Sequence, residues 1–220
     1  MDPAALSALA QLAGPVMLRA TGLTLLFALS SMVCGLALGT AVALARVMQL
    51  PVLQVVARLY VSLFRGTPLL VQVFIIYYGL PSIGIEFSPV SAGILSLTLN
   101  VAAYLSESLR GAVAGVGGGQ WMAGTSLGLT HLQTLHHVVA PQALRVAVPS
   151  LSNSLISLIK DTSLVSVIAV TELMLATKEL ISTTFQPFPL YIAAAAVYWV
   201  LSLAFEQLQR VLEKRLAFPN

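Results

Sequence analysis

The chain alternates between long apolar runs and short polar intervals. A helix that crosses the hydrocarbon core of a bilayer takes about 20 apolar residues. The apolar runs therefore predict an all-α, polytopic membrane protein with five transmembrane helices. We expect these spans near residues 21–45, 59–80, 89–109, 148–170 and 189–209.

Two of the intervals between the expected spans have a character of their own. Residues 111–147 are too polar to cross a membrane and form the longest interval. A shorter amphipathic stretch covers residues 172–185 and is ended by Pro187 and Pro189. The composition of the chain is similar on both sides of each interval, so we expect one membrane domain over residues 1–220.

Composition supports a membrane protein and excludes several other classes. The chain is 58% hydrophobic and 9% charged, with a mean hydropathy of +0.92, whereas soluble domains carry about a quarter charged residues. The net charge of +3 is not concentrated in a basic cluster, which argues against nucleic-acid binding. Cys34 is the single cysteine, so no disulfide can form within the chain.

The distribution of basic residues predicts the orientation. Loops on the cytoplasmic side carry an excess of Lys and Arg. With the N-terminus outside and the C-terminus in the cytoplasm, Arg19 and Lys178 lie outside, and Lys160 lies within a span. The other basic residues then fall on the cytoplasmic side, namely Arg46, Arg58, Arg65, Arg110, Arg145, Arg210, Lys214 and Arg215.

The 111–147 interval reads as two short helices joined by a turn. Consecutive glycines at 117–119 end the preceding helix, and a helix is expected over residues 120–127 with Gly128 as its left-handed cap. Thr130 and Gln133 form a capping-box pattern, which predicts a second helix over residues 131–139 that stops at Pro141.

This helix pair places Trp121, Met122, Leu127 and Leu129 where we expect them to be exposed. An apolar surface of this kind indicates a docking site for another protein. The alternative is a helix pair that rests on lipid head groups.

Polar side chains also occur inside the expected spans. Asn100, Tyr104 and Glu107 are spaced by four and three residues, so they share one helix face. Such a face should point into the bundle, either to line a substrate pocket or to join helices by hydrogen bonds. Glu107 alone could also extend to the cytoplasmic interface.

The fourth span carries Lys160, Asp161, Thr162 and Ser163 near its middle. A local break in the helix would relieve the cost of these charges, and broken helices bind ions and zwitterions in transporters. Glu107 or Asp161 could pair with an ammonium, and Lys160 or a helix N-terminus with a carboxylate. Alternatively, Lys160 and Asp161 pair with other helices for assembly, or they lie near an interface.

Four motifs, in order, resemble the permease subunits of bacterial polar amino-acid ABC importers of the histidine, glutamine and arginine type. They cover most of the chain from residue 21 onward. The motifs are Arg65-Gly66-Thr67-Pro68, then Ala102-Ala103-Tyr104 with Glu107 and Arg110-Gly111, then Gly119-Gln120-Trp121 with Leu127-Gly128-Leu129 and Pro141-Gln142-Ala143-Leu144-Arg145, and finally residues 156–168, ISLIKDTSLVSVI.

The resemblance implies the fold of type I ABC importer permeases and a set of partners. Those are a second permease chain, two ATPase subunits that bind ATP and Mg²⁺, an extracytoplasmic substrate-binding protein and an amino acid. It implies a bacterial inner-membrane location and no cofactor on this chain. The implied substrate contacts are Thr67, Asn100, Tyr104, Glu107, Lys160, Asp161 and Ser163. The implied ATPase-coupling residues are Gln120, Trp121, Met122, Ala123, Gly124, Leu127, Gly128 and Leu129.

The chain departs from the family pattern at three positions of the coupling segment. Met122 replaces an acidic residue, Gly124 replaces an alanine, and Ala140 replaces a leucine. The charged part of the ATPase contact is thereby in question. Apolar packing by Met122 could replace it, or this chain could be the more weakly coupled half of a heterodimer.

Other chemistry is not indicated. The chain lacks a GxxxxGK[ST] loop and a nucleophile-elbow pattern, so we expect a permease that is not itself an enzyme. A metal site is not expected at the histidines, because no cysteine or carboxylate accompanies His131, His136 and His137. The alternative function is an ion-coupled secondary transporter or channel with Glu107 and Asp161 as proton carriers. A third is a purely structural subunit. The sequence leaves open which amino acid is carried, and whether the permease pair is a homodimer or a heterodimer.

Overall fold

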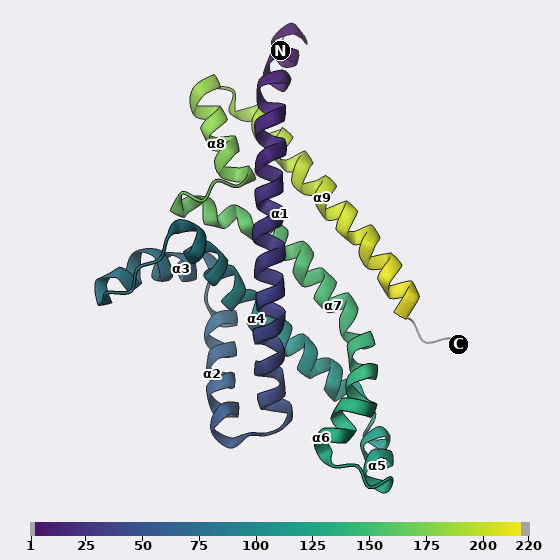
Figure 1. Cartoon of the computed structure of the whole chain (residues 1–220). Coiled ribbons are helices and arrows are strands. Elements are labelled where there is room, and N and C mark those ends of the chain that lie inside the picture. The colour runs from purple at the N-terminus through teal and green to yellow at the C-terminus, as the bar shows by residue number, and fades with distance from the viewer. Residues whose placement is uncertain (1–2, 217–220) are drawn as a thin grey trace.

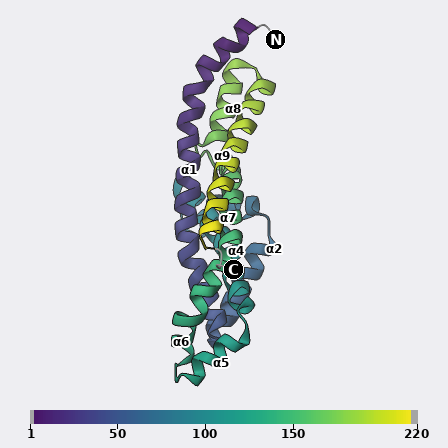
Figure 2. The ribbon, with the colours of Figure 1, turned by 90° about the vertical axis from the view of Figure 1, so that its right-hand side faces the viewer.

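The computed structural model describes residues 3–216, with side chains from 7 to 215, and these residues form helices and turns without a β-strand. The all-α prediction is therefore confirmed. Seen from two directions at right angles, the helices form a broad but thin assembly rather than a round bundle (Figures 1 and 2). The N-terminal end of α1 (Pro3–Val47) and the α5–α6 pair lie at opposite ends of it (Figure 1).

Three of the helices are long and apolar enough to cross a membrane. These are α1 (Pro3–Val47), α4 (Pro89–Gly115) and α9 (Pro187–Leu216). They correspond to the first, third and fifth expected spans, but each extends beyond the predicted bounds. The extension of α1 is the largest. The residues before the expected span are only mildly apolar, yet they continue the helix.

The second expected span is not one helix, and in this respect the prediction was wrong. The chain forms α2 (Pro51–Gly66) and α3 (Leu69–Phe74), which meet at an angle of 108°. Thr67 and Pro68 between them are extended, because proline cannot donate a helical hydrogen bond and disfavours helical backbone in the residue before it. A π-helical turn (Ile75–Gly79) and a 3₁₀ turn (Leu80–Ile83) follow α3.

The fourth expected span does not continue as one α-helix; a local break was one of the alternatives that its charges left open. Helix α7 (Ala140–Asp161) ends at the aspartate and continues as a 3₁₀ helix (Thr162–Ile168), which stops at Ala169 with a φ of 58°. The Asp161 side chain does not cap the new turn. With the bent α2–α3 pair counted as one span, the described residues contain up to four candidate spans by length and apolarity. The count of five stays a prediction.

The two short helices of the 111–147 segment form as expected at their start. Helix α5 (Gly118–Ser126) is followed by Gly128 at a φ of 76°, and Thr130 and Gln133 make both hydrogen bonds of a capping box at α6 (His131–Thr134). The predicted stop at Pro141 was wrong. A π-helical turn (Leu135–Val139) runs straight into α7, and the Ala140 N–H bonds to the Leu135 carbonyl. The wider turn absorbs the proline without ending the helix.

Helices α1 and α4 form the most extensive pair in the molecule. Gly35 and Gly39 of α1 face α4 so closely that a Cβ on Gly35 would lie 2.4 Å from Val101, and one on Gly39 would lie 2.9 Å from the Ala102 carbonyl oxygen. Small residues four apart allow two membrane helices to approach in this way. The close pair fixes the position of the polar face of α4.

The stretch expected to be amphipathic forms α8 (Leu173–Thr184). Glu172 is fully buried and caps α8 through its bond to the Leu175 N–H, and it also accepts a hydrogen bond of 2.7 Å from the Tyr198 hydroxyl of α9. The Leu173 N–H bonds to Thr24 of α1. These contacts hold α8 against α1 and α9, and the polar cavity lies elsewhere.

Candidate functional site

A cavity of about 600 Å³ opens where α2 ends, between α4 and α7. This volume suits a small ligand. Its walls combine charged, hydroxyl and amide side chains with a few apolar ones. The lining residues are Arg65, Thr67, Pro68, Leu69, Asn100, Val101, Tyr104, Glu107, Ser108, Ser150, Asn153, Ser154, Ser157, Leu158 and Asp161.

Most of the residues expected to contact substrate meet in this cavity. The break between α2 and α3 supplies Thr67, the polar face of α4 supplies Asn100, Tyr104 and Glu107, and the end of α7 supplies Asp161. The spacing of the three residues on α4 thus correctly predicted that they share one face of the helix.

Two expected substrate contacts do not line the cavity. Lys160 is exposed outside it, and the Ser163 hydroxyl donates to the Lys160 carbonyl oxygen at 2.7 Å. The physical reason is helical geometry, since neighbouring residues of a helix point in different directions. Asp161 faces the cavity, so the adjacent Lys160 does not.

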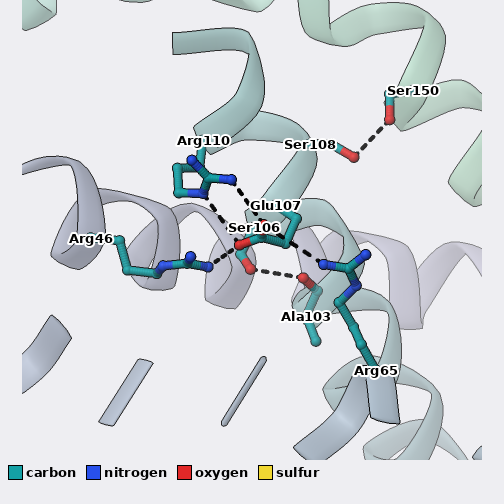
Figure 3. A network of polar contacts seen from close by, with 8 residues as sticks. All are labelled: Arg46, Arg65, Ala103, Ser106, Glu107, Ser108, Arg110 and Ser150. Atoms are coloured by element: carbon teal, nitrogen blue, oxygen red, sulfur yellow. Dashed lines mark hydrogen bonds and ion pairs between the residues drawn. The ribbon is translucent and has the colours of Figure 1, made fainter. Parts of the chain in front are cut away.

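Sequence reasoning missed the wall formed by α7. Ser150, Asn153, Ser154 and Ser157 recur at intervals of three or four residues and reach the cavity together with Asp161. This spacing is the signal that could have revealed a polar face. The Ser150 hydroxyl lies 2.6 Å from that of Ser108, so the wall is joined to α4 by a hydrogen bond (Figure 3).

Glu107 stands at the centre of a cluster of three arginines (Figure 3). Arg46 of α1 bonds to one carboxylate oxygen, while Arg110 lies 3.0 Å and Arg65 of α2 lies 3.7 Å from the other. The Glu107 side chain is 20% exposed, so these pairs are only partly screened by water. One carboxylate therefore joins α1, α2 and α4.

Arg65 is the exception among the three arginines. It is 43% exposed, lines the cavity, and its guanidinium lies 5.4 Å from the centre of the Tyr104 ring. Its distance from Glu107 exceeds that of a hydrogen bond. The sequence analysis placed Arg65 on the cytoplasmic side and in the Arg65-Gly66-Thr67-Pro68 motif but did not expect it to contact substrate, yet among the described residues it is the cationic side chain that lines the cavity.

Asp161 is the second carboxylate of the cavity and differs from Glu107. Among the described residues, no basic side chain lies within ion-pair distance of Asp161. The cavity thus contains one carboxylate that is already neutralised and one that is available to a cation.

A second cavity, of about 530 Å³, lies on the other side of the arginine cluster. Arg46 and Arg110 line it, together with Trp121 of α5 and His131 of α6. The first cavity contains Glu107 itself and Arg65. The ion cluster is therefore a wall between the polar cavity and a hollow that borders the α5–α6 pair.

The α5–α6 pair exposes part of the apolar surface that was predicted. Met122 is 67% and Leu127 80% exposed. Trp121 is instead half-buried, because its ring stacks on that of His131 with 4.5 Å between the centres, and Leu129 is also half-buried. Gln120, Ala123 and Gly128 are exposed.

Gly124 is the buried member of the expected coupling residues, and its neighbour explains one departure from the family pattern. A Cβ at position 124 would lie 2.4 Å from Cγ2 and 2.7 Å from Oγ1 of Thr134. Thr134 is completely buried, so it has no room to move aside. Glycine at this position is therefore required by the threonine on α6.

Known proteins resemble this chain in sequence and in fold. Residues 32–218 match the family model described as "Binding-protein-dependent transport system inner membrane component". The probable amino-acid ABC transporter permease protein YckA of Bacillus subtilis is 41% identical over 203 residues, which cover 92% of this chain and 90% of YckA. The L-cystine transport system permease protein TcyB of the same organism is 44% identical over 84% of this chain and 80% of its own.

Solved structures show the same fold. The crystal structure of an amino acid ABC transporter with histidines contains a chain with a TM-score of 0.87 and 34% identity, covering 92% of this chain and 94% of that one. A chain of the MetNI methionine ABC transporter, 16% identical, has a TM-score of 0.65 and supports the fold alone.

The fold and the family model define a multi-pass membrane component of a transport system rather than an enzyme. This chain belongs to the family of inner-membrane components of binding-protein-dependent transport systems, the permease subunits of ABC importers.

Proposed function

We propose that this chain forms the path for a polar amino acid, together with a second permease chain. The observation that carries the proposal is the cavity that presents Arg65 and Asp161 together. An amino acid at neutral pH has both an ammonium and a carboxylate, so it needs one group of each sign. Asp161 would take the ammonium, and Arg65, rather than Lys160, would take the carboxylate.

The remaining expected contacts have supporting roles in this proposal. Thr67, Asn100 and Tyr104 line the same cavity and offer neutral hydrogen-bonding groups or an aromatic face. Glu107 acts through the arginines that it holds, because its own charge is already compensated. The relatives named for cystine and glutamine transport support an amino acid as cargo.

Energy would come from partner ATPase subunits, which would bind the ATP and Mg²⁺. Met122 and Leu127 support a docking contact there, because Met122 of α5 and Leu127 directly after that helix are both exposed, and exposed apolar side chains close together are costly in water. The contact would then be mainly apolar, since Met122 stands where the family has an acidic residue. An extracytoplasmic binding protein would deliver the amino acid on the side of the N-terminus, and the C-terminus would lie in the cytoplasm.

The proposal is tested by uptake of labelled amino acids into proteoliposomes that contain this chain, its ATPase and its binding protein. ATP on the ATPase side should drive uptake of one or a few members of the panel. Uptake that ignores ATP and follows a proton gradient would instead support an ion-coupled secondary transporter with Asp161 as proton carrier.

The coupling role of the α5–α6 pair is tested by Gly128→Asp. Its φ of 76° is strained for aspartate, and the new charge stands next to the exposed Leu127. We expect loss of ATP-driven uptake and of co-purified ATPase. Gly111→Asp is the matched control, because it adds the same charge on α4 where no atom lies within 4 Å of a new Cβ. Equal behaviour of the two variants would contradict docking at α5–α6.

A further inference from the structure

The break between α2 and α3 leaves a backbone carbonyl without its helical partner. In a continuous helix the Phe64 carbonyl would accept from the nitrogen of residue 68, but that residue is Pro68 and has no hydrogen to donate. This partly buried acceptor therefore needs another donor. Gln72 of α3 supplies it, since its Nε2 lies 2.9 Å from the Phe64 oxygen.

This contact fixes which way the Gln72 carboxamide points. Nε2 also lies 3.1 Å from the Thr67 carbonyl oxygen and 2.9 Å from the Thr67 hydroxyl. A carbonyl oxygen can only accept a hydrogen bond, so the NH₂ group must face the break. The Gln72 Oε1 must therefore face the opposite way, toward α4.

The orientation of Gln72 in turn fixes that of Asn100. Oε1 lies 2.9 Å from the Asn100 Nδ2, and because Oε1 is an acceptor, Asn100 has to donate. Nδ2 also lies 3.4 Å from the Phe64 oxygen. Both N–H groups of Asn100 are thereby engaged within the wall. Its Oδ1 accepts from no donor among residues 7–215, while Asn100 itself lines the cavity.

We propose that Gln72 is a positioning residue that selects for an ammonium group, by holding Asn100 with its Oδ1 as a hydrogen-bond acceptor for the cavity. The inference rests on the proposed function, in which the cavity holds an amino acid. A reversed carboxamide would offer N–H donors, which repel an ammonium. Asn100 thus supplies the cavity with a second hydrogen-bond acceptor, in addition to Asp161. The break at Pro68 determines that the Asn100 carboxamide presents its oxygen, and not its NH₂ group, to the cavity.

The test measures binding of labelled amino acids to the complete permease–ATPase complex in nanodiscs, without the extracytoplasmic protein, which has its own selectivity. The probes are a panel that includes L-glutamine and L-cystine. For the amino acid that binds, its des-amino analogue, with hydrogen in place of the amino group, is used as a competitor. The quantity of interest is the ratio of the two affinities.

We expect Asn100→Leu to lower the affinity for the amino acid by about 10- to 100-fold, the worth of a hydrogen bond to a charged group. The affinity for the des-amino analogue should stay within about twofold, so the ratio collapses. Gln72→Met, similar in shape but without hydrogen bonds, should lower the same ratio by a smaller factor. In the Asn100→Leu background, Gln72→Met should have no further effect on it.

Gln207→Met is the matched control, because Gln207 is exposed on α9, and it should keep the wild-type ratio. Equal losses for the amino acid and its analogue in Gln72→Met, or additive effects of the two variants, would show a structural role and overturn the proposal. If Gln72→Met does not assemble, Asn100→Leu decides alone, since an unchanged ratio refutes the acceptor. A wild-type complex that binds no amino acid would instead refute the proposed function.

Discussion

Glu107 and Asp161 are two carboxylates of one cavity, and they are held in opposite ways. Glu107 receives three arginines from three helices, whereas Asp161 has no basic partner within ion-pair distance in the part of the chain that the structure describes. An unpaired charge inside a membrane protein is costly and marks a functional group by default. The comparison assigns assembly to Glu107 and cargo binding to Asp161, although both are carboxylates of the same cavity.

The difference also separates two uses of charge within the molecule. Glu107 already has three cationic partners, so the ammonium group of a ligand gains little by approaching this carboxylate. Asp161 lacks such compensation, so a cation that reaches it replaces water with a charged partner. A carboxylate on the polar face of a membrane helix can therefore be interpreted only after its partners from other helices are known.

The largest expected effect is that of Glu107→Gln. It leaves three guanidiniums facing a neutral amide, and removing one partner of a buried ion pair costs about 3–5 kcal/mol. We expect a value near the lower end, because Arg65 and Arg110 are about 40% exposed. The measurement is the unfolding midpoint of the purified complex, which should fall together with uptake. Glu206→Gln, whose pair with Arg210 is exposed, is the control and should leave the midpoint unchanged.

Asp161→Asn should separate binding from stability. The fold loses no ion pair, so the unfolding midpoint should stay the same or rise. The apparent affinity for the transported amino acid should fall by about 10- to 100-fold, because a charge-assisted hydrogen bond is lost. Concentration-dependent uptake measures this effect. A fall in stability as large as that of Glu107→Gln would end the distinction between the two carboxylates.

Replacing the arginines one at a time should sharpen the comparison. Arg46 is 16% exposed and bonded directly to Glu107, so Arg46→Gln should cost about 1.5–3 kcal/mol. Arg65 lies 3.7 Å away and is 43% exposed, so Arg65→Gln should cost about 0.5 kcal/mol. Arg65→Gln should nonetheless impair uptake more than stability. The same change in stability for both variants would contradict unequal roles for these arginines.

The smallest effect is expected for Ser150→Ala. The variant removes the hydrogen bond to Ser108 between α7 and α4, but the remaining Ser108 hydroxyl lines the cavity and can be solvated there. We expect a loss of about 0.5 kcal/mol, at the lower limit for a hydrogen bond, and uptake close to that of the wild type. A large loss of uptake would instead place a cargo contact on the serine-rich wall of α7.

The sequence predicted features that depend on local spacing. The shared face of Asn100, Tyr104 and Glu107 and the capping box at Thr130 were evident from neighbouring residues, whereas a break near Asp161 was one of several alternatives that the charges left open. The break at Pro68 had its local signal as well, but the apolar run on both sides led to a single predicted span.

What could not be predicted depends on contacts between distant segments. Arg46 lies 61 residues from Glu107 in sequence, so no pattern shows that they meet. The π-helical turn before Pro141 has the same origin, because burial of Leu135 and Val139 against other helices favours a continuous helix over a stop at proline. Packing of this kind determines which of two locally acceptable backbones forms.

The contact of Gly124 with Thr134 has a consequence for exchanging coupling segments between related permeases. The alanine typical of the family cannot be restored by itself, because its methyl group would overlap the buried threonine. Position 124 can gain a side chain only when residue 134 becomes smaller, so α5 and α6 should be transplanted together. A chimera that takes only one of the two helices from a relative would report on the fit between residues 124 and 134. It would not report on the contact with a partner protein.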